Sequence, residues 1–246
     1  ALRSPLNGVD VAVGAPVLVL APHPDDFDAI GVTLRLLHER GSAIHLAVAT
    51  TGAGGVEDAD CTPPTAGAKA ALRESEQRES CRFFGLPEVR VKFLRLAEDE
   101  RGHPIVGDAN DSTVRALLAV VRPAAVFLPH GHDTNVSHQR VYAMLRSAAL
   151  HAHDAPPFTA FLNRDPKTVA MRYDVVTPYG EDRAAWKGTL LRFHRSQQLR
   201  NLRRRGRGFD ERILAMDRDS AAASGAAGPY AEVFETETFA GPATTG

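Results

Sequence analysis

The stretch Ala15-Pro-Val-Leu-Val-Leu-Ala-Pro-His-Pro-Asp-Asp-Phe-Asp28 decides the fold. Its first half is a short apolar run typical of a buried strand, which we place at Val17–Ala21. Its second half sets a histidine and three aspartates between that strand and a helical pattern over Ala29–Glu39. In open α/β sheets, ligands bind outside the carboxyl ends of the strands, so these polar side chains are well placed for chemistry.

Outward from this stretch, short apolar runs alternate with longer helical patterns, which is the signature of βαβ units and a mainly parallel sheet. Further strands are predicted at Ile44–Thr50, Val89–Leu94, Ala124–Leu128, Thr168–Val176 and Tyr230–Phe234. Further helices are predicted at Ala68–Phe84 (ended by Gly85), Ser112–Val121, Val141–Leu150 and Arg183–Arg204. Residues 52–67, rich in Gly, Pro and Asp, are expected to form a loop that could act as a mobile lid. We therefore predict an α/β, Rossmann-like three-layer fold with a mainly parallel sheet, as a single domain over residues 1–246.

The composition is that of an ordinary globular protein, with 43% hydrophobic residues, 24% charged residues and a net charge of −1. Such a balance gives no argument for a nucleic-acid partner. The two cysteines, Cys61 and Cys81, imply no disulfide framework and favour a reducing compartment. The longest apolar run near the start is too short to cross a bilayer, so no integral membrane segment and a cytoplasmic location are expected. Self-association into a homo-oligomer, common for such domains, is a further expectation.

The first candidate site lies in the segment that follows the first strand. His23 and Asp26 are three residues apart and could converge on one cation through a nitrogen and an oxygen, which leaves Asp25 free to act as a base. The alternative is a proline turn whose aspartates cap a helix N-terminus and favour its dipole. This segment alone leaves both interpretations open.

A second segment, Pro129-His-Gly-His-Asp-Thr-Asn-Val-Ser-His-Gln139, also follows a predicted strand and precedes a helix. His138 opens that helix and could supply a third ligand. Two histidines and one carboxylate with an open position are a familiar arrangement for hydrolytic zinc. His130, His132 and His138 could each be an ordinary loop histidine, but metal-competent clusters at the ends of two strands favour a metal site.

These motifs resemble those of the LmbE-like, or PIG-L, family of zinc-dependent N-acetylglucosaminyl de-N-acetylases. Pro22-His-Pro-Asp-Asp26 after an apolar strand is similar to the hallmark of that family. Further similar elements are Arg73-Glu-Ser-Glu76 with Phe84-Gly-Leu86, Trp186-Lys187 with His194-Arg-Ser-Gln197, and Tyr230-Ala-Glu-Val-Phe234. The motifs occur in order along nearly the whole chain.

The resemblance implies an enzyme that hydrolyses the acetamide of an N-acetylated amino-sugar conjugate and releases acetate and a free amine. It implies that His23, Asp26 and His138 hold Zn²⁺ and that Asp25 is the general base. His194 is a candidate for stabilising the oxyanion, although it could equally be a helix residue bonded to a neighbouring carbonyl.

The chain departs from the family pattern in two places. Phe27 stands where a glutamate commonly follows the two aspartates, and Asn135-Val-Ser-His138 replaces the usual His-Pro-Asp-His. Asn135 can still donate a hydrogen bond to an oxyanion, so we keep it as a catalytic candidate, but it cannot carry a proton. Ser137 cannot orient an imidazole with a negative charge. His132 and Asp133 are the residues that could substitute and, with Arg73, are expected on the substrate side of the site.

One segment, residues 183–209, has an unusual charge, with eight arginines, one lysine and no acidic residue. Such a run is commonly a solvated helix face. It could also attract an anionic partner, such as a substrate with a phosphate or carboxylate or an acidic lipid surface. Nucleic acid is disfavoured because few aromatic residues are interleaved to stack on bases.

Two other functions compete with the deacetylase. A metal-dependent phosphoesterase also uses His and Asp clusters, but such sites usually gather several carboxylates and often two metals. A sugar-binding relative with weakened catalysis is compatible with Asn135 and Ser137, although a protein that only binds has little need of Asp25.

Overall fold

The computed structural model describes residues 4–5, 11–151 and 156–239 and contains one eight-stranded sheet. The strands are β1 Ser4–Pro5, β2 Pro16–Ala21, β3 Ala43–Val48, β4 Val91–Phe93, β5 Ala125–Pro129, β6 Phe158–Asn163, β7 Val175–Tyr179 and β8 Tyr230–Phe239. Their order is β1-β7-β8-β6-β5-β2-β3-β4, and only β8 runs antiparallel to its neighbours. The chain runs outward from β2 in one direction through β3 and β4, and from β5 in the other to β6. The switch point of the sheet, where such folds bind ligands, therefore lies between β2 and β5.

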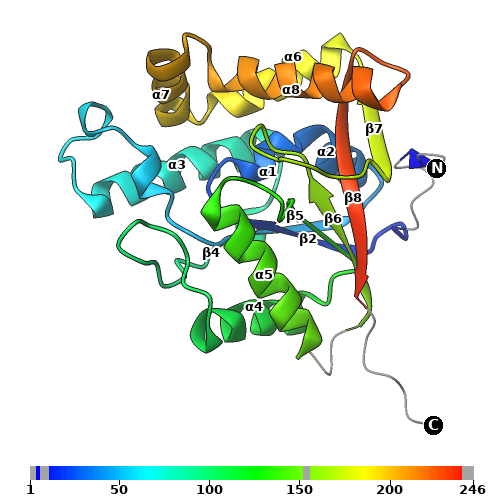
Figure 1. Cartoon of the computed structure of the whole chain (residues 1–246), viewed down its shortest axis with the longest axis horizontal. Coiled ribbons are helices and arrows are strands. Elements are labelled where there is room, and N and C mark those ends of the chain that lie inside the picture. Colours follow the sequence, from blue (N-terminus) through cyan, green and yellow to red (C-terminus); the bar gives the residue numbers. More distant parts are fainter. Residues whose placement is uncertain (1–3, 6–10, 152–155, 240–246) are drawn as a thin grey trace.

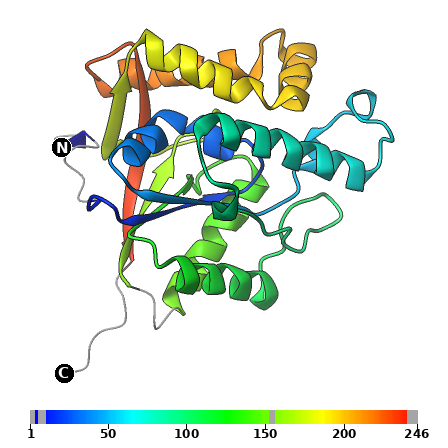
Figure 2. The same cartoon turned by 180° about the vertical axis from the view of Figure 1, so that it is seen from behind.

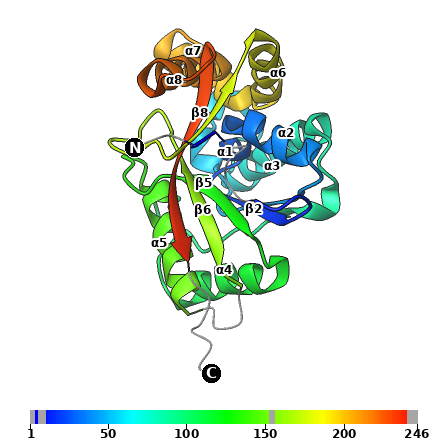
Figure 3. The ribbon, with the colours of Figure 1, turned by 90° about the vertical axis from the view of Figure 1, so that its right-hand side faces the viewer.

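Helices cover both faces of the sheet and make a three-layer fold (Figures 1 and 2). They are α1 Asp26–Ala29, α2 Gly31–Glu39, α3 Ala66–Phe84, α4 Asp108–Val121, α5 Val136–Leu150, α6 Glu181–Arg192, α7 Arg195–Arg205 and α8 Phe209–Ser224. Val17 and Val19 of β2 face the core under α2 and α3, whereas Leu18 and Leu20 face the core over α4 and α5. Both faces of β2 are thus buried, which explains its continuous apolar sequence. Figure 3 shows α6, α7 and α8 grouped beside β7 and β8.

The predicted fold class is confirmed, and the differences lie in the C-terminal half. The sequence analysis missed β6 and α8 and predicted a strand over 168–176, of which only the end, from Val175, belongs to β7. The C-terminal strand, predicted over Tyr230–Phe234, extends to Phe239 and lies between β6 and β7. These errors share a cause: an antiparallel strand inserted into a parallel sheet breaks the simple alternation of strand and helix on which the prediction rested.

The predicted helix Arg183–Arg204 is two helices, because the chain turns at Phe193 and His194. Tertiary contacts fix this turn. The backbone N–H and the hydroxyl of Ser196 both donate to Glu76 of α3, each at 2.7 Å. The Nε2 atom of His194 lies 2.6 Å from Asp28 Oδ2. The helical pattern alone could not reveal a break that is made by partners more than a hundred residues away.

The model also bears on the membrane prediction. Within the described part of the chain, no helix is both long and apolar enough to pass through a bilayer.

Candidate metal centre

Three of the predicted ligands meet at the carboxyl ends of β2 and β5. His23 and Asp26 follow β2, and His138 lies in the first turn of α5, which follows β5. One ligand atom from each lies within 4.8 Å of the others. Asp26 joins the set, because its Oδ2 lies 3.3 Å from His23 Nδ1 and its Oδ1 lies 3.5 Å from His138 Nε2. The structure therefore brings the predicted set together.

The chemistry of this cluster fits a cation. The Nε2 atom of His138 is buried and has no hydrogen-bond partner, although it faces the cluster. Burial alone would raise the pKa of Asp26, but His138 and His23 outweigh it and hold the pKa well below the usual range. Burial would lower the pKa of His138, yet Asp26 and Asp133 raise it well above the usual value. The carboxylates of Asp26 and Asp133 thus favour a positive charge at the His138 side chain. A bound divalent ion can provide that charge in place of the proton on the imidazole.

Asp133 orients the imidazole of His138. Its Oδ2 lies 3.0 Å from His138 Nδ1, and its Oδ1 accepts a 2.7 Å hydrogen bond from the backbone N–H of Asn135. Its side chain is fully buried and does not line the cavity beside the cluster. Asp133 therefore makes the carboxylate contact that Ser137 cannot make, as the sequence analysis allowed. Its placement does not support a direct contact with substrate.

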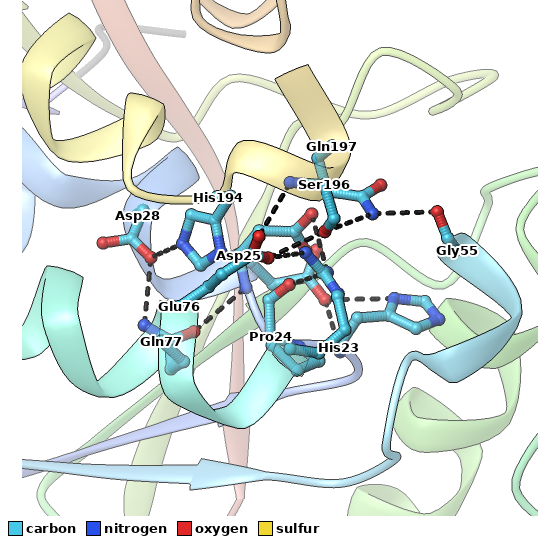
Figure 4. Close-up of polar contacts among 12 residues, drawn as sticks. His23, Pro24, Asp25, Asp28, Gly55, Glu76, Gln77, His194, Ser196 and Gln197 are labelled. Atoms are coloured by element: carbon cyan, nitrogen blue, oxygen red, sulfur yellow. Dashed lines mark hydrogen bonds and ion pairs between the residues drawn. The ribbon is translucent and has the colours of Figure 1, made fainter. Parts of the chain in front are cut away.

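Asp25 lies next to the cluster in a strained backbone conformation, with φ 121° and ψ −23°. Such a conformation persists only where the surroundings hold it. Gln77 accepts a 3.0 Å hydrogen bond from the Asp25 backbone N–H, and Arg73 Nη2 lies 3.1 Å from Asp25 Oδ2. Arg73 also donates to the carbonyl of Pro24 (Figure 4). The helix α3 thus holds the Asp25 carboxylate at the rim of the cavity.

Arg73 is itself buried, with 2% of its surface exposed, and its Nη1 lies 3.5 Å from Glu76. Arg73 therefore ties α3 to the loop that carries Pro24 and Asp25. Arg73 also lines the cavity, so its predicted place near a substrate is compatible with the model.

A cavity of about 300 Å³ opens onto the cluster. His23, Asp25, Asp26, Asn135 and His138 all line it. The Oδ1 atom of Asn135 caps α5 by accepting from the backbone N–H of Ser137 at 3.1 Å. The predicted ligands, the predicted base and Asn135 therefore share one cavity.

Two residues that the sequence analysis did not single out also line this cavity. Asp165 follows β6, and burial, together with Asp133 and Asp26, raises its pKa against the opposing effect of His138. His103 comes from the loop after β4, and its Nδ1 lies 2.9 Å from the hydroxyl of Ser137. An aspartate after the apolar run Phe158–Asn163 was a signal for the first, had that strand been recognised. No local pattern marks His103.

Besides Asp133, two predicted residues do not line the cavity. The side chain of His194 is fully buried against Asp28, which also accepts a hydrogen bond from Gln77 (Figure 4). Ser80 donates a further hydrogen bond to Asp28. This placement supports a structural link between α1, α3 and α7, and gives no support to a contact with an oxyanion. His132 is exposed, with its ring against that of His130, outside the set of residues that line the cavity.

The predicted lid, residues 52–67, contains two 3-10 turns, Ala53–Gly55 and Asp58–Asp60. The side chain of Gln197 on α7 donates to the carbonyl of Gly55 at 3.0 Å (Figure 4). Arg204 Nη2 lies 2.6 Å from Glu57, and Arg203 pairs with Asp60. Glu57 and Asp60 of this segment therefore contact arginines of α7, whereas Asp58 pairs with Lys69 of α3.

Fold and site together define a Rossmann-like α/β domain with a metal-competent His–Asp–His cluster at the switch point of its sheet. The model of the PIG-L family, described as GlcNAc-PI de-N-acetylase, matches residues 18–149. The chain belongs to this family. No curated protein matches it significantly.

Solved structures share the fold at low sequence identity. N,N'-diacetylchitobiose deacetylase from Pyrococcus horikoshii is 18% identical, with a TM-score of 0.76 over 94% of this chain and 88% of that one. The 4-carboxy-2-hydroxymuconate hydratase GalB from Pseudomonas putida is 19% identical, with a TM-score of 0.66 over 90% and 95%. The zinc-inhibited form of teicoplanin deacetylase Orf2 is 15% identical, with a TM-score of 0.60 over 91% and 98%. Because a hydratase stands among these deacetylases, the fold alone does not fix the reaction.

Proposed function

We propose that the protein is a zinc-dependent de-N-acetylase that hydrolyses the acetamide of an N-acetylated amino-sugar conjugate and releases acetate and a free amine. The observation that carries the proposal is the metal-competent cluster of His23, Asp26 and His138 with the carboxylate of Asp25 beside it. Membership of a de-N-acetylase family supports the same reaction. The Zn²⁺-inhibited relative makes zinc the first metal to test.

In this proposal His23, Asp26 and His138 hold the ion. When bound, Zn²⁺ supplies Lewis acidity, which makes water more acidic and polarises the carbonyl of an amide. Asp25 accepts the proton of the attacking water, and Arg73, at 3.1 Å, keeps that carboxylate in position. Asp133 holds the His138 ring so that its Nε2 faces the ligand cluster.

Two further side chains complete the proposed mechanism. Asn135 lines the cavity, and its amide can donate a hydrogen bond to the developing oxyanion. His103 also lines the cavity and is a third histidine in addition to the two ligands. We assign to His103 the delivery of a proton to the leaving amine, which Asn135 cannot perform.

The alternatives predict different outcomes. The second metal-competent group is Asp133, His138 and Asp165, but its Asp133 is already the partner of His138 Nδ1, on the ring edge opposite the Nε2 that faces the first cluster. This use of Asp133 to orient His138 disfavours a two-metal phosphoesterase. A sugar-binding relative would hold metal without turnover. A hydratase would add water to an unsaturated substrate and release no acetate.

The test measures zinc per chain by elemental analysis and acetate release from N-acetylglucosamine conjugates. We expect about one zinc in the wild type and its loss in His138→Ala, because that variant removes one of three ligands. The matched control is His132→Ala, which removes an exposed histidine outside the cavity and should keep the metal. A wild-type protein that takes up no zinc would contradict the metal site. A zinc-loaded protein that releases no acetate would contradict the reaction and leave the metal site standing.

A further inference from the structure

Four arginines form part of the cavity wall. Arg200, Arg204 and Arg205 lie on α7, Arg212 lies in the first turns of α8, and all four line the same cavity as the ligand cluster. We call these four residues the arginine wall. Figure 1 shows α7 and α8 above α3, with α7 at the upper left of the view.

The arginine wall is short of negative charge. Glu57 lies 2.6 Å from Arg204 and 3.8 Å from Arg200, so two guanidinium groups share one carboxylate. For Arg205 and Arg212, no carboxylate of residues 4–5, 11–151 or 156–239 lies at ion-pair distance. A bound divalent ion with Asp26 as its one carboxylate ligand would add further positive charge to the cavity.

The outward arginines of the same segment differ from the wall. Arg192 lies 2.8 Å from Asp210, Arg195 lies 3.0 Å from Glu79, and Arg203 pairs with Asp60. These three arginines, each with a carboxylate of its own, lie outside the cavity lining, whereas Arg200, Arg204 and Arg205 of the same segment line the cavity and have only Glu57 as an ion-pair partner among the described residues. A merely solvated helix face gives no reason for this distribution.

The guanidinium groups of the wall also act on one another. Burial lowers the pKa of Arg200, and Arg204 and Arg205 lower it further. Burial lowers the pKa of Arg212, Asp165 and Asp25 oppose this, and Arg205 and Arg200 add to it. The repulsion among these positive charges, of which Arg200 and Arg212 are half-buried, is relieved when an anion binds between them.

We propose that the arginine wall is an anion subsite that binds a phosphate group of the substrate, so that the substrate is a phosphorylated N-acetyl amino-sugar conjugate. This inference rests on the proposed function. Several guanidinium groups exceed what one carboxylate can neutralise, whereas a phosphate offers up to two charges and several acceptor oxygens. The wall lines a cavity, and Arg200 and Arg212 are half-buried. A small phosphate group can enter this cavity, whereas a flat lipid surface cannot, so the wall suits the phosphate better.

The test compares acetate release from N-acetylglucosamine with that from its 1-phosphate and 6-phosphate. We expect the wild type to have at least a tenfold higher kcat/KM for one phosphorylated compound. Arg205→Gln/Arg212→Gln should lower that ratio about tenfold per arginine, because each removes a charge-assisted contact. The matched control is Arg207→Gln, which removes the charge of an exposed arginine outside the cavity and should keep the wild-type ratio.

A second measurement separates this proposal from the proposed function. Calorimetric titration of the zinc-loaded proteins with inorganic phosphate needs no turnover, and thermal unfolding checks that each variant is folded. Phosphate binding that is lost in the double variant and kept in Arg207→Gln would support the subsite even if no acetate is released. Equal kcat/KM for neutral and phosphorylated compounds, or phosphate binding that the double variant retains, would overturn it. So would binding to vesicles of anionic phospholipid that the double variant abolishes while free phosphate does not bind.

Discussion

Two of the charged clusters in the described part of the chain differ in how completely their atoms are satisfied. One is the ligand cluster of His23, Asp26 and His138 at the end of the sheet. The other, which we call the lysine cluster, is Lys187 of α6 with Asp217 of α8 and Glu232 of β8, all at most 2% exposed. Both bring charges into the interior, where an unpaired charge is costly.

In the lysine cluster every charged group has partners within the chain. Lys187 Nζ lies 2.5 Å from Asp217 and 2.7 Å from Glu232. Glu232 also accepts hydrogen bonds from the backbone N–H groups of Val32 and Thr33, at 3.1 and 2.7 Å. Four elements, α2, α6, α8 and β8, are thereby tied together. The ligand cluster instead leaves the buried Nε2 of His138 without a hydrogen bond and borders a cavity.

The comparison teaches which family-like motifs serve structure and which serve chemistry. Trp186-Lys187 and Tyr230-Ala-Glu-Val-Phe234 supply two members of the closed lysine cluster. The first motif supplies His23 and Asp26 of the ligand cluster, and residues 135–138 supply His138. A motif that a family shares is thus not by itself a site, and the two clusters differ in whether a buried nitrogen without a hydrogen-bond partner belongs to a residue that lines a cavity.

The largest effect that would sharpen this contrast is expected from Asp25→Asn. Loss of the base should lower kcat for acetate release by about 10²- to 10⁴-fold. Zinc content and the unfolding temperature should stay close to wild type, because asparagine tolerates the positive φ of this position better than most residues. Steady-state kinetics and elemental analysis on the same preparation check both. Unchanged turnover would refute the role of Asp25.

The opposite pattern is expected from Lys187→Met. Two carboxylates would be left buried without their cation, which should lower the free energy of unfolding by about 3–5 kcal/mol. The zinc bound per folded chain should not change. Urea unfolding followed by circular dichroism measures the loss. The control is Lys69→Met, which removes a cation paired with the exposed Asp58 and should cost less than 1 kcal/mol. A Lys187→Met protein that is as stable as the wild type but binds no zinc would contradict the structural role of the lysine cluster and link it to metal binding instead.

The ligand cluster could be predicted from the sequence because the geometry of the parallel strands largely determines where its residues lie. Polar residues that directly follow parallel neighbouring strands must meet at one edge of the sheet, so His23, Asp26 and His138 could be joined without knowing the loops. Asp165 obeys the same rule and was missed only because β6 was missed.

Other parts of the site were beyond prediction because long-range contacts decide them. His103 reaches the cavity through a loop in which Asp99 accepts a 3.0 Å hydrogen bond from the His103 backbone N–H and pairs with Arg140 at 2.6 Å. His194 turns away because Asp28, 166 residues distant in sequence, binds its Nε2. No periodicity or spacing records such partners.

A smaller effect is expected when the support of the ligand cluster is weakened without removing a ligand. Asp133→Asn keeps the size of the side chain but removes the charge beside His138 Nδ1. Zinc affinity should fall about 10- to 100-fold, as is usual when the partner of a metal-binding histidine is changed. Competition with a chromogenic chelator measures this affinity. Ser137→Ala, which alters the neighbouring side chain and leaves Asp133 intact, should keep it. An equal loss of zinc affinity in both variants would mean that Asp133 is not the residue that orients His138.

The smallest effect is expected at His103, because Asp25 can itself return a proton to the leaving amine. His103→Gln keeps a polar side chain beside Ser137 and should lower kcat about tenfold. This decrease is smaller than the one typical when an enzyme loses its only general acid. The decisive readout is the leaving group: the loss should be largest for alkylamine conjugates, whose nitrogen must be protonated before it departs, and smaller for a 4-nitroacetanilide-type substrate, whose activated anilide departs with less protonation. A merely structural role would lower turnover of both substrates equally. His45→Gln, a histidine on β3 remote from the cavity lining, is the control for a general effect of losing an imidazole.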